Sequence, residues 1–125
     1  MNPSPHEQPT IYQAKKAVVQ QHEYGNLKIY IDLHGHANKK GCFIFGNNLK
    51  GDQQADNMLF ARLVSLNSLN FDFQECSFAE KLMTAKDAGS GLSREGSGRV
   101  GIFKATNLIN CYTLECHYQT GRRIN

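Results

Sequence analysis

The 125-residue chain has no tryptophan and no apolar run long enough to cross a bilayer, which argues against a membrane-spanning protein. It also has no large excess of charge of one sign. Its net charge is +3 and its 14 basic residues are spread along the chain, which argues against a nucleic-acid-binding protein. The first residues lack the basic and then apolar layout of a secretion signal, so we expect a cytoplasmic protein.

The four cysteines show no closely spaced pairs, so the sequence does not predict a small zinc-finger module. Each cysteine lies in an apolar or strand-like run. Without a secretion signal, such cysteines are usually reduced core residues. They are Cys42, Cys76, Cys111 and Cys116.

The order of predicted elements favours an α/β fold in one domain, a mostly parallel mixed sheet with flanking helices. A helix is predicted from Pro9 to about Glu23, because proline suits a first helical turn and Gly25 is a natural stop. A second helix is predicted near Gln53–Leu69, where leucines at helical spacing predict a face packed in the core. These leucines are Leu59, Leu63, Leu66 and Leu69.

Other segments have the apolar composition or the alternation that is typical of strands. The predicted strands are Leu27–Leu33, Cys42–Phe45, Arg99–Thr106 and Cys111–Tyr118. Phe71–Phe78 fits a short strand or an extended loop. Asp87–Gly98 is rich in glycine and serine and predicts a loop. It contains two Gly-x-Gly spacings, but no preceding strand and following helix support a dinucleotide site.

Polar residues gather where the first predicted strand ends, within Ile29–Gly46. Asp32, His34 and His36 lie around Gly35. In an open α/β sheet, the catalytic and ligand-binding residues usually lie in the loops at the carboxyl ends of the strands. His34 follows such a strand end and is therefore a candidate metal ligand. The alternative is a solvated loop, because His-x-His at a polar turn often has no ligand role.

Glu115 lies in the last predicted strand, on the face that alternation assigns to Thr113 and His117. Burial of a carboxylate in a hydrophobic strand costs free energy unless the charge is paired or has a functional role. Glu115 is therefore either a satisfied structural residue or a general base whose pKa is tuned by partial burial and a nearby cation. The residues alone leave both readings open.

Several motifs of this chain closely resemble the cytosolic carboxypeptidases, which are intracellular zinc metallocarboxypeptidases that trim glutamates from tubulin tails. The branch that removes branch-point glutamates is the most similar. The resemblance covers nearly the whole chain. The motifs are Asp32-Leu33-His34-Gly35-His36, Lys39-Lys40-Gly41-Cys42-Phe43, Asn57-Met58-Leu59, Ser65-Leu66-Asn67-Ser68, Phe71-Asp72-Phe73-Gln74, Glu95-Gly96-Ser97-Gly98-Arg99-Val100 and Tyr112-Thr113-Leu114-Glu115-Cys116.

The resemblance implies that His34 is a zinc ligand and that Glu115 is the general base, which takes a proton from a zinc-bound water. It implies a substrate such as tubulin or another glutamate-rich tail. Arg99 and Lys104 are candidates for binding an acidic side chain, with solvent-facing strand-end charges as the alternative. Phe103 occupies a substrate-binding position where many metallocarboxypeptidases have a tyrosine, so that hydroxyl is absent here.

Parts of the family's pattern are missing. The family takes two zinc ligands from a His-x-x-Glu pair, and no histidine here is followed three positions later by an acidic residue. The Asn-Leu-Asn-Arg stretch that binds the substrate's terminal carboxylate and the final helix are also absent. We therefore expect residues 1–125 to form the C-terminal part of a zinc carboxypeptidase catalytic domain, with a complete Zn²⁺ site only when the missing N-terminal part is present.

The alternative is a catalytically inactive remnant that acts at most as a binding module. For the intact enzyme the resemblance implies a cytoplasmic location and allows an association with microtubules. A partial sheet would leave a strand edge and apolar faces uncovered, so we also expect low solubility or self-association.

Overall fold

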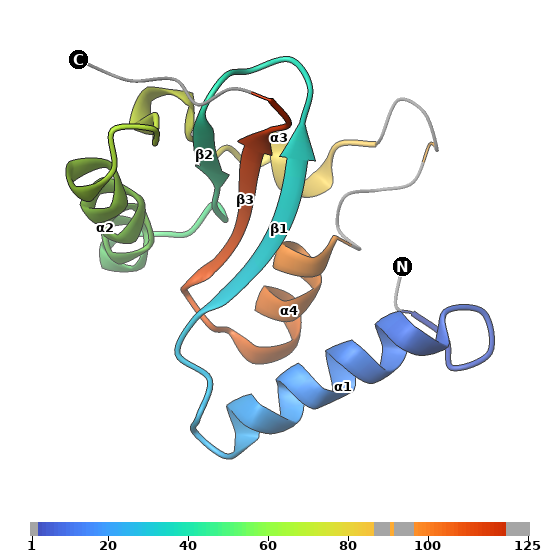
Figure 1. Ribbon diagram of the computed structural model, residues 1–125. Helices are drawn as coiled ribbons and strands as arrows, with labels where there is room; N and C mark the ends of the chain where they lie inside the picture. Colours follow the sequence, from blue (N-terminus) through green and yellow to red (C-terminus); the bar gives the residue numbers. More distant parts are fainter. Residues whose placement is uncertain (1–2, 87–90, 92–96, 120–125) are drawn as a thin grey trace.

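The computed structural model describes residues 3–86, 91 and 97–119, so most of the predicted loop Asp87–Gly98 lies outside the described residues. Helices surround a small mixed sheet, which confirms the predicted α/β class (Figure 1). No helix of the described part is both long and apolar enough to cross a membrane. The elements are α1 (Pro9–Glu23), β1 (Tyr30–His36), β2 (Cys42–Phe45), α2 (Asp52–Asn67), the 3₁₀ helix η1 (Phe73–Glu75), α3 (Lys81–Thr84), α4 (Gly98–Thr106) and β3 (Cys111–His117).

The described sheet has the strand order β1-β3-β2, so the last strand in the chain lies between the first two (Figure 1). Strand β3 runs parallel to β1 and antiparallel to β2. The parallel register pairs Tyr30 with Cys111 and continues to His36 with His117. Consequently His34 and Glu115 are direct neighbours across the two strands.

One face of the sheet packs against α2 and forms the core. Ile44 of β2 and Tyr112 of β3 cluster with Ala61 of α2 and with Phe71. The ring of Phe60 stacks on Tyr112 with 4.9 Å between the centroids. The buried hydroxyl of Tyr112 donates a hydrogen bond of 2.9 Å to the Asn57 carbonyl oxygen, which ties β3 to α2 and satisfies the only polar group of a large core side chain.

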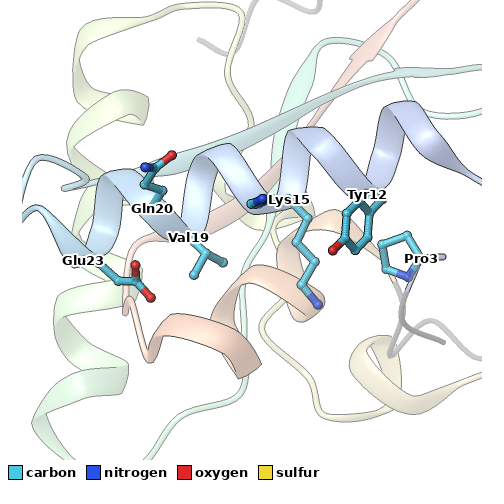
Figure 2. Close-up of a pocket in the computed structure, with 7 residues that line it drawn as sticks. Pro3, Tyr12, Lys15, Val19, Gln20 and Glu23 are labelled. Carbon is cyan, nitrogen blue, oxygen red and sulfur yellow. The ribbon is translucent and has the colours of Figure 1, made fainter. Parts of the chain in front are cut away.

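Helix α4 packs against β1 and β3, and α1 lies against α4 in turn (Figure 1). Val100 and Ile102 of α4 are buried, whereas α1 has no fully buried residue. Figure 2 shows side chains of α1, among them Tyr12, Lys15 and Val19, that line an open pocket together with Pro3. Helix α1 therefore forms an outer layer of the described structure.

Three sequence-based predictions of secondary structure hold closely. Helix α1 has the predicted bounds, β2 matches Cys42–Phe45, and β3 ends one residue before the predicted Tyr118. The predicted strand Leu27–Leu33 is shifted, because β1 begins at Tyr30 and extends to His36. His34 and His36 therefore lie within a strand and not in the loop that follows it. Phe71–Phe78 contains η1 between isolated bridges to Cys42 and Phe45.

The predicted strand Arg99–Thr106 is wrong, because this segment is the helix α4. Its valine, isoleucine and phenylalanine favour strands in isolation, but tertiary contacts override that preference. Arg99, Ile102 and Thr106 are all buried, and they recur at the helical spacing that places them on one face. The helix ends at Thr106, and the next residue, Asn107, has a left-handed φ of 56°.

The prediction that the leucines of α2 pack in the core is also wrong. Leu59, Leu63 and Leu66 are half or more exposed, at 53%, 50% and 66%, and Leu69 beyond the helix is 68% exposed. The side of α2 that meets the sheet carries a second set of residues at helical spacing. These are Asn57, Phe60, Ala61 and Val64.

Candidate active site

The polar residues of β1 lie on the face of the sheet that α4 covers in part. Alternate residues of a strand share a face, so Asp32, His34 and His36 project to the same side. The parallel register places Glu115 of β3 opposite His34 on this face. An ideal Cβ added at Gly98, the first residue of α4, would lie 2.6 Å from Asp32 Oδ2, which shows that the N-terminal turn of α4 packs directly on this cluster.

Glu115 is the buried centre of this arrangement, with 7% of its surface exposed. Its Oε1 lies 3.7 Å from His34 Nδ1, and its Oε2 lies 3.7 Å from His36 Nδ1. Both distances exceed those of a hydrogen bond but allow charge attraction to a protonated imidazole. Each carboxylate oxygen therefore faces a different ring, and the two imidazoles flank one carboxylate.

Asp32 fixes the orientation of His34. The Nε2 atom of His34 lies 3.1 Å from Asp32 Oδ2, whereas its Nδ1 faces Glu115. If Nε2 carries the proton and donates it to Asp32, the lone pair of Nδ1 is free to bind a ligand. Metal-binding histidines commonly hold their second nitrogen against a carboxylate in this way.

Aromatic and basic side chains border the cluster next to β2. The ring of His36 meets Phe43 edge-on, with 5.2 Å between the centroids. Lys39 Nζ lies 5.1 Å from the centre of the same Phe43 ring and 2.6 Å from Glu75 Oε2. The Lys39 ammonium is thus paired with Glu75, while His36 is held by packing.

The three predicted substrate-binding residues are all on α4, but their environments differ. Arg99 is buried, and its guanidinium donates hydrogen bonds to the Gly46 carbonyl, to Asn47 Oδ1 at 2.8 Å and to the Leu82 carbonyl at 3.2 Å. The alternative of a solvent-facing strand-end charge is therefore wrong for Arg99. Phe103 is half-buried and Lys104 is exposed. A substrate-binding role for any of the three stays a prediction.

The described residues do not complete a metal site. Among residues 3–86, 91 and 97–119, no group of three or more histidine, cysteine, aspartate or glutamate side chains is arranged to hold a metal ion. A catalytic zinc takes three protein ligands and an open position. His34 fits one of these ligand positions, and the described residues supply too few of the others to hold a zinc by themselves.

The sequence comparisons identify the relatives of this chain. No model of a known protein family matches it. It is 49% identical over 123 residues to cytosolic carboxypeptidase-like protein 5 of Bos taurus, covering 98% of this chain and 14% of that protein. By sequence homology, the chain belongs to the cytosolic carboxypeptidase family.

Other members of the family agree. The identity is 60% over 97 residues to cytosolic carboxypeptidase-like protein 5 of Danio rerio, covering 77% of this chain and 11% of that protein. It is 29% over 121 residues to cytosolic carboxypeptidase 6 of Homo sapiens, covering 94% of this chain and 22% of that protein. The chain thus spans less than a quarter of the length of these relatives.

The contact between Asp32 and His34 is a feature that sequence reasoning missed. Asp32 and His34 are two positions apart, and such residues share a face when both lie in a strand. The signal was present, but the predicted strand ended at Leu33 and placed His34 in a loop. A strand extended to His36 would have predicted this contact.

Proposed function

We propose that this chain contributes two functional residues, His34 and Glu115, to the active site of a zinc metallocarboxypeptidase. The substrates would be C-terminal or branch-point glutamates of acidic protein tails such as those of tubulin. The observation that supports this proposal is the convergence of the two side chains from β1 and β3, with 3.7 Å between Nδ1 and Oε1. The family of the relatives supports the reaction class.

In this proposal His34 supplies one ligand to the zinc, through Nδ1. Asp32 holds the opposite nitrogen, so the ring has one orientation before any ligand binds. A zinc held there would lower the pKa of a bound water and polarise the scissile carbonyl. The remaining ligands would come from polypeptide outside this segment, since the described residues provide no group of three.

Glu115 would act as the general base of peptide hydrolysis. A water oxygen bonds to the terminal peptide carbonyl carbon, Glu115 accepts the water proton, and the C–N bond breaks as Glu115 passes that proton to the leaving amine. Strand β3 is paired on both sides, by β1 and by β2, so the carboxylate is held on the most constrained strand of the sheet. Its burial limits the access of bulk water to the carboxylate.

The experiment is a segment exchange. Cytosolic carboxypeptidase-like protein 5 of Danio rerio, with its matching segment replaced by this chain, should release glutamate from a glutamate-tailed peptide. In that chimera Glu115→Gln should lower kcat by about 10²- to 10⁴-fold with its zinc retained, because only proton transfer is lost. His34→Ala should lose zinc as well as activity.

The matched control is Glu23→Gln, which changes an exposed carboxylate on α1 and should leave kcat unchanged. A Glu115→Gln chimera with kcat close to that of the parent chimera would refute the proposed role of Glu115. The inactive remnant remains the second hypothesis for the chain by itself. Metal analysis of the chimera and of its His34→Ala variant separates the two. Zinc that the chimera holds and the variant loses would support a contribution of this segment to an enzyme site, and a chimera without zinc would support the remnant.

A further inference from the structure

Two cysteines lie directly opposite each other on the antiparallel strands β2 and β3. The register pairs Cys42 with Cys116. The backbone N–H of His117 donates a hydrogen bond of 3.0 Å to the Gly41 carbonyl. The hydrogen-bonded pair is thus Gly41 with His117, and the neighbouring pair of Cys42 with Cys116 is a non-hydrogen-bonded pair. Residues at such a non-hydrogen-bonded position have Cα atoms about 4.5 Å apart, and their side chains project side by side.

This geometry suits a covalent bond between the two sulfurs. Disulfides usually join residues whose Cα atoms are about 4.4–6.8 Å apart, and the expected separation lies inside that window. Both Cys42 and Cys116 are partly exposed. Cys116 directly follows Glu115 in β3, so the cysteine pair lies on the opposite face of the sheet from the candidate active site.

The other two cysteines have different surroundings. Cys111 is fully buried at 0% exposure. The Cys76 sulfur accepts a hydrogen bond of 3.2 Å from the Ile44 N–H. Burial raises the pKa of the Cys111 thiol to about 12 and of the Cys76 thiol to about 11. The pKa of Cys116 is raised in the same way, so the pairing geometry and not thiol acidity distinguishes Cys42 and Cys116 from the other two. Neither Cys76 nor Cys111 has a cysteine opposite it in the described sheet.

We propose that Cys42 and Cys116 form a reversible cross-strand disulfide, a redox modification site directly behind Glu115. The oxidant would be a low-molecular-weight disulfide such as oxidised glutathione. One protein thiolate attacks it, forms a mixed disulfide and releases one glutathione thiol. The second protein thiolate then attacks the protein sulfur of the mixed disulfide, forms the Cys42–Cys116 bond and releases the second glutathione thiol.

In this balance one disulfide breaks and one forms, and the two protein thiol protons end on the two released glutathione thiols. In a cytosolic protein such a bond is expected to be transient and redox-sensing rather than permanent. Burial, followed by the hydrogen bond to Cys42, raises the pKa of Cys116 to about 11. Closure should therefore be slow at pH 7 and faster as the pH rises toward 10, because the thiolate is the attacking form.

The test uses the full 125-residue chain, incubated with oxidised glutathione over a range of protein concentrations. The reaction is stopped with acid, remaining thiols are alkylated, and the digest is mapped by mass spectrometry. We expect a Cys42–Cys116 linked peptide in a monomer about 2 Da lighter, with Cys76 and Cys111 alkylated. Dithiothreitol should restore all four alkylation sites.

Two variants sharpen the result. Cys76→Ser should close to the same extent as the parent chain. Cys116→Ser should stop at a glutathione adduct on Cys42, which dithiothreitol removes. Free Cys42 and Cys116 at saturating oxidant, a different cysteine pair, or bonds only between chains would each overturn the proposal. The peptide map of the parent chain decides the question even if a variant does not fold.

Discussion

Replacing Arg99 with methionine separates a structural arginine from a substrate-binding one. Methionine retains an apolar stem of similar length, so the change removes the guanidinium with little loss of packing volume. The guanidinium donates to the Gly46 carbonyl, to Asn47 Oδ1 and to the Leu82 carbonyl. It thereby joins α4 to the segment after β2 and to α3, which are distant in the sequence.

The magnitude follows from these bonds. Hydrogen bonds from a charged donor contribute about 1.5–3 kcal/mol each, and a buried acceptor without a partner costs about 1–3 kcal/mol. Gly46 and Asn47 are buried and would lose this donor, whereas Leu82 is partly exposed, so we expect a loss of about 3–5 kcal/mol for the three bonds together. A domain of this size has a total stability of only about 5–15 kcal/mol. Arg99→Met should therefore unfold at a much lower urea concentration than the parent chain.

The assay is urea unfolding followed by far-ultraviolet circular dichroism. The matched control is Lys16→Met, which removes an exposed charge from helix α1 and should change the stability by less than about 0.5 kcal/mol. If Arg99→Met unfolds at the same urea concentration as the control, the guanidinium does not hold these segments together. A substrate-binding role would then be the better account of Arg99.

Three further predictions test the packing, the titration and the surface. Gly46→Ala should lower the free energy of unfolding by about 1–3 kcal/mol in the same urea assay. The added Cβ would lie 2.3 Å from the Phe78 ring and 2.6 Å from Asn57 Oδ1, so these neighbours would have to move. An unchanged urea midpoint would contradict this close approach. Burial raises the pKa of Cys111 from 9.0 to about 12, so its contribution to stability is complete below pH 9 and is lost as the pH rises through 12. The urea midpoint of the parent chain should fall between pH 9 and pH 12, and the midpoint of Cys111→Ala should fall less over the same range. An equal decrease of the two midpoints would contradict this prediction. Leu63→Gln should change the free energy of unfolding by less than about 0.5 kcal/mol, since the side chain is 50% exposed. It should nevertheless weaken self-association of the chain, measured by sedimentation equilibrium. An unchanged association constant would show that the exposed leucines of α2 do not mediate self-association.

The sequence predicts the elements whose signals are local. Pro9 at the start of α1 and Gly25 after its end, with a φ of 75°, mark a helix without reference to the rest of the chain. The alternation in β3 likewise places Glu115 on its correct face. Which strands pair is a different matter, because β1 and β3 are separated by most of the chain and periodicity does not encode partners. The resemblance to a family, rather than the pattern of residues, predicted that His34 and Glu115 converge.

Helix α4 shows how a long-range contact changes the interpretation of a residue. As part of a strand, Arg99 would stand at an exposed end and could meet an acidic substrate. As part of a helix, it is turned inward with Ile102 and Thr106, and its donors reach carbonyl groups from two other segments. A buried arginine is stable only if such acceptors surround it. No local pattern in the sequence reveals those acceptors. The wrong prediction of a strand at Arg99–Thr106 therefore also led to the wrong alternative that Arg99 faces solvent.

Helix α2 shows that a correct period does not determine which stripe faces the core. Two sets of residues recur at helical spacing, one with leucines and one with Asn57 and Ala61. The small Ala61 lets the helix approach the sheet closely, and the Asn57 amide donates 2.6 Å to the Ile109 carbonyl, so the stripe with less apolar surface is buried. The leucines remain exposed, as does Leu33 of the edge strand β1 at 74%. Because these side chains are exposed in the monomer, replacing them should affect association between molecules more than folding.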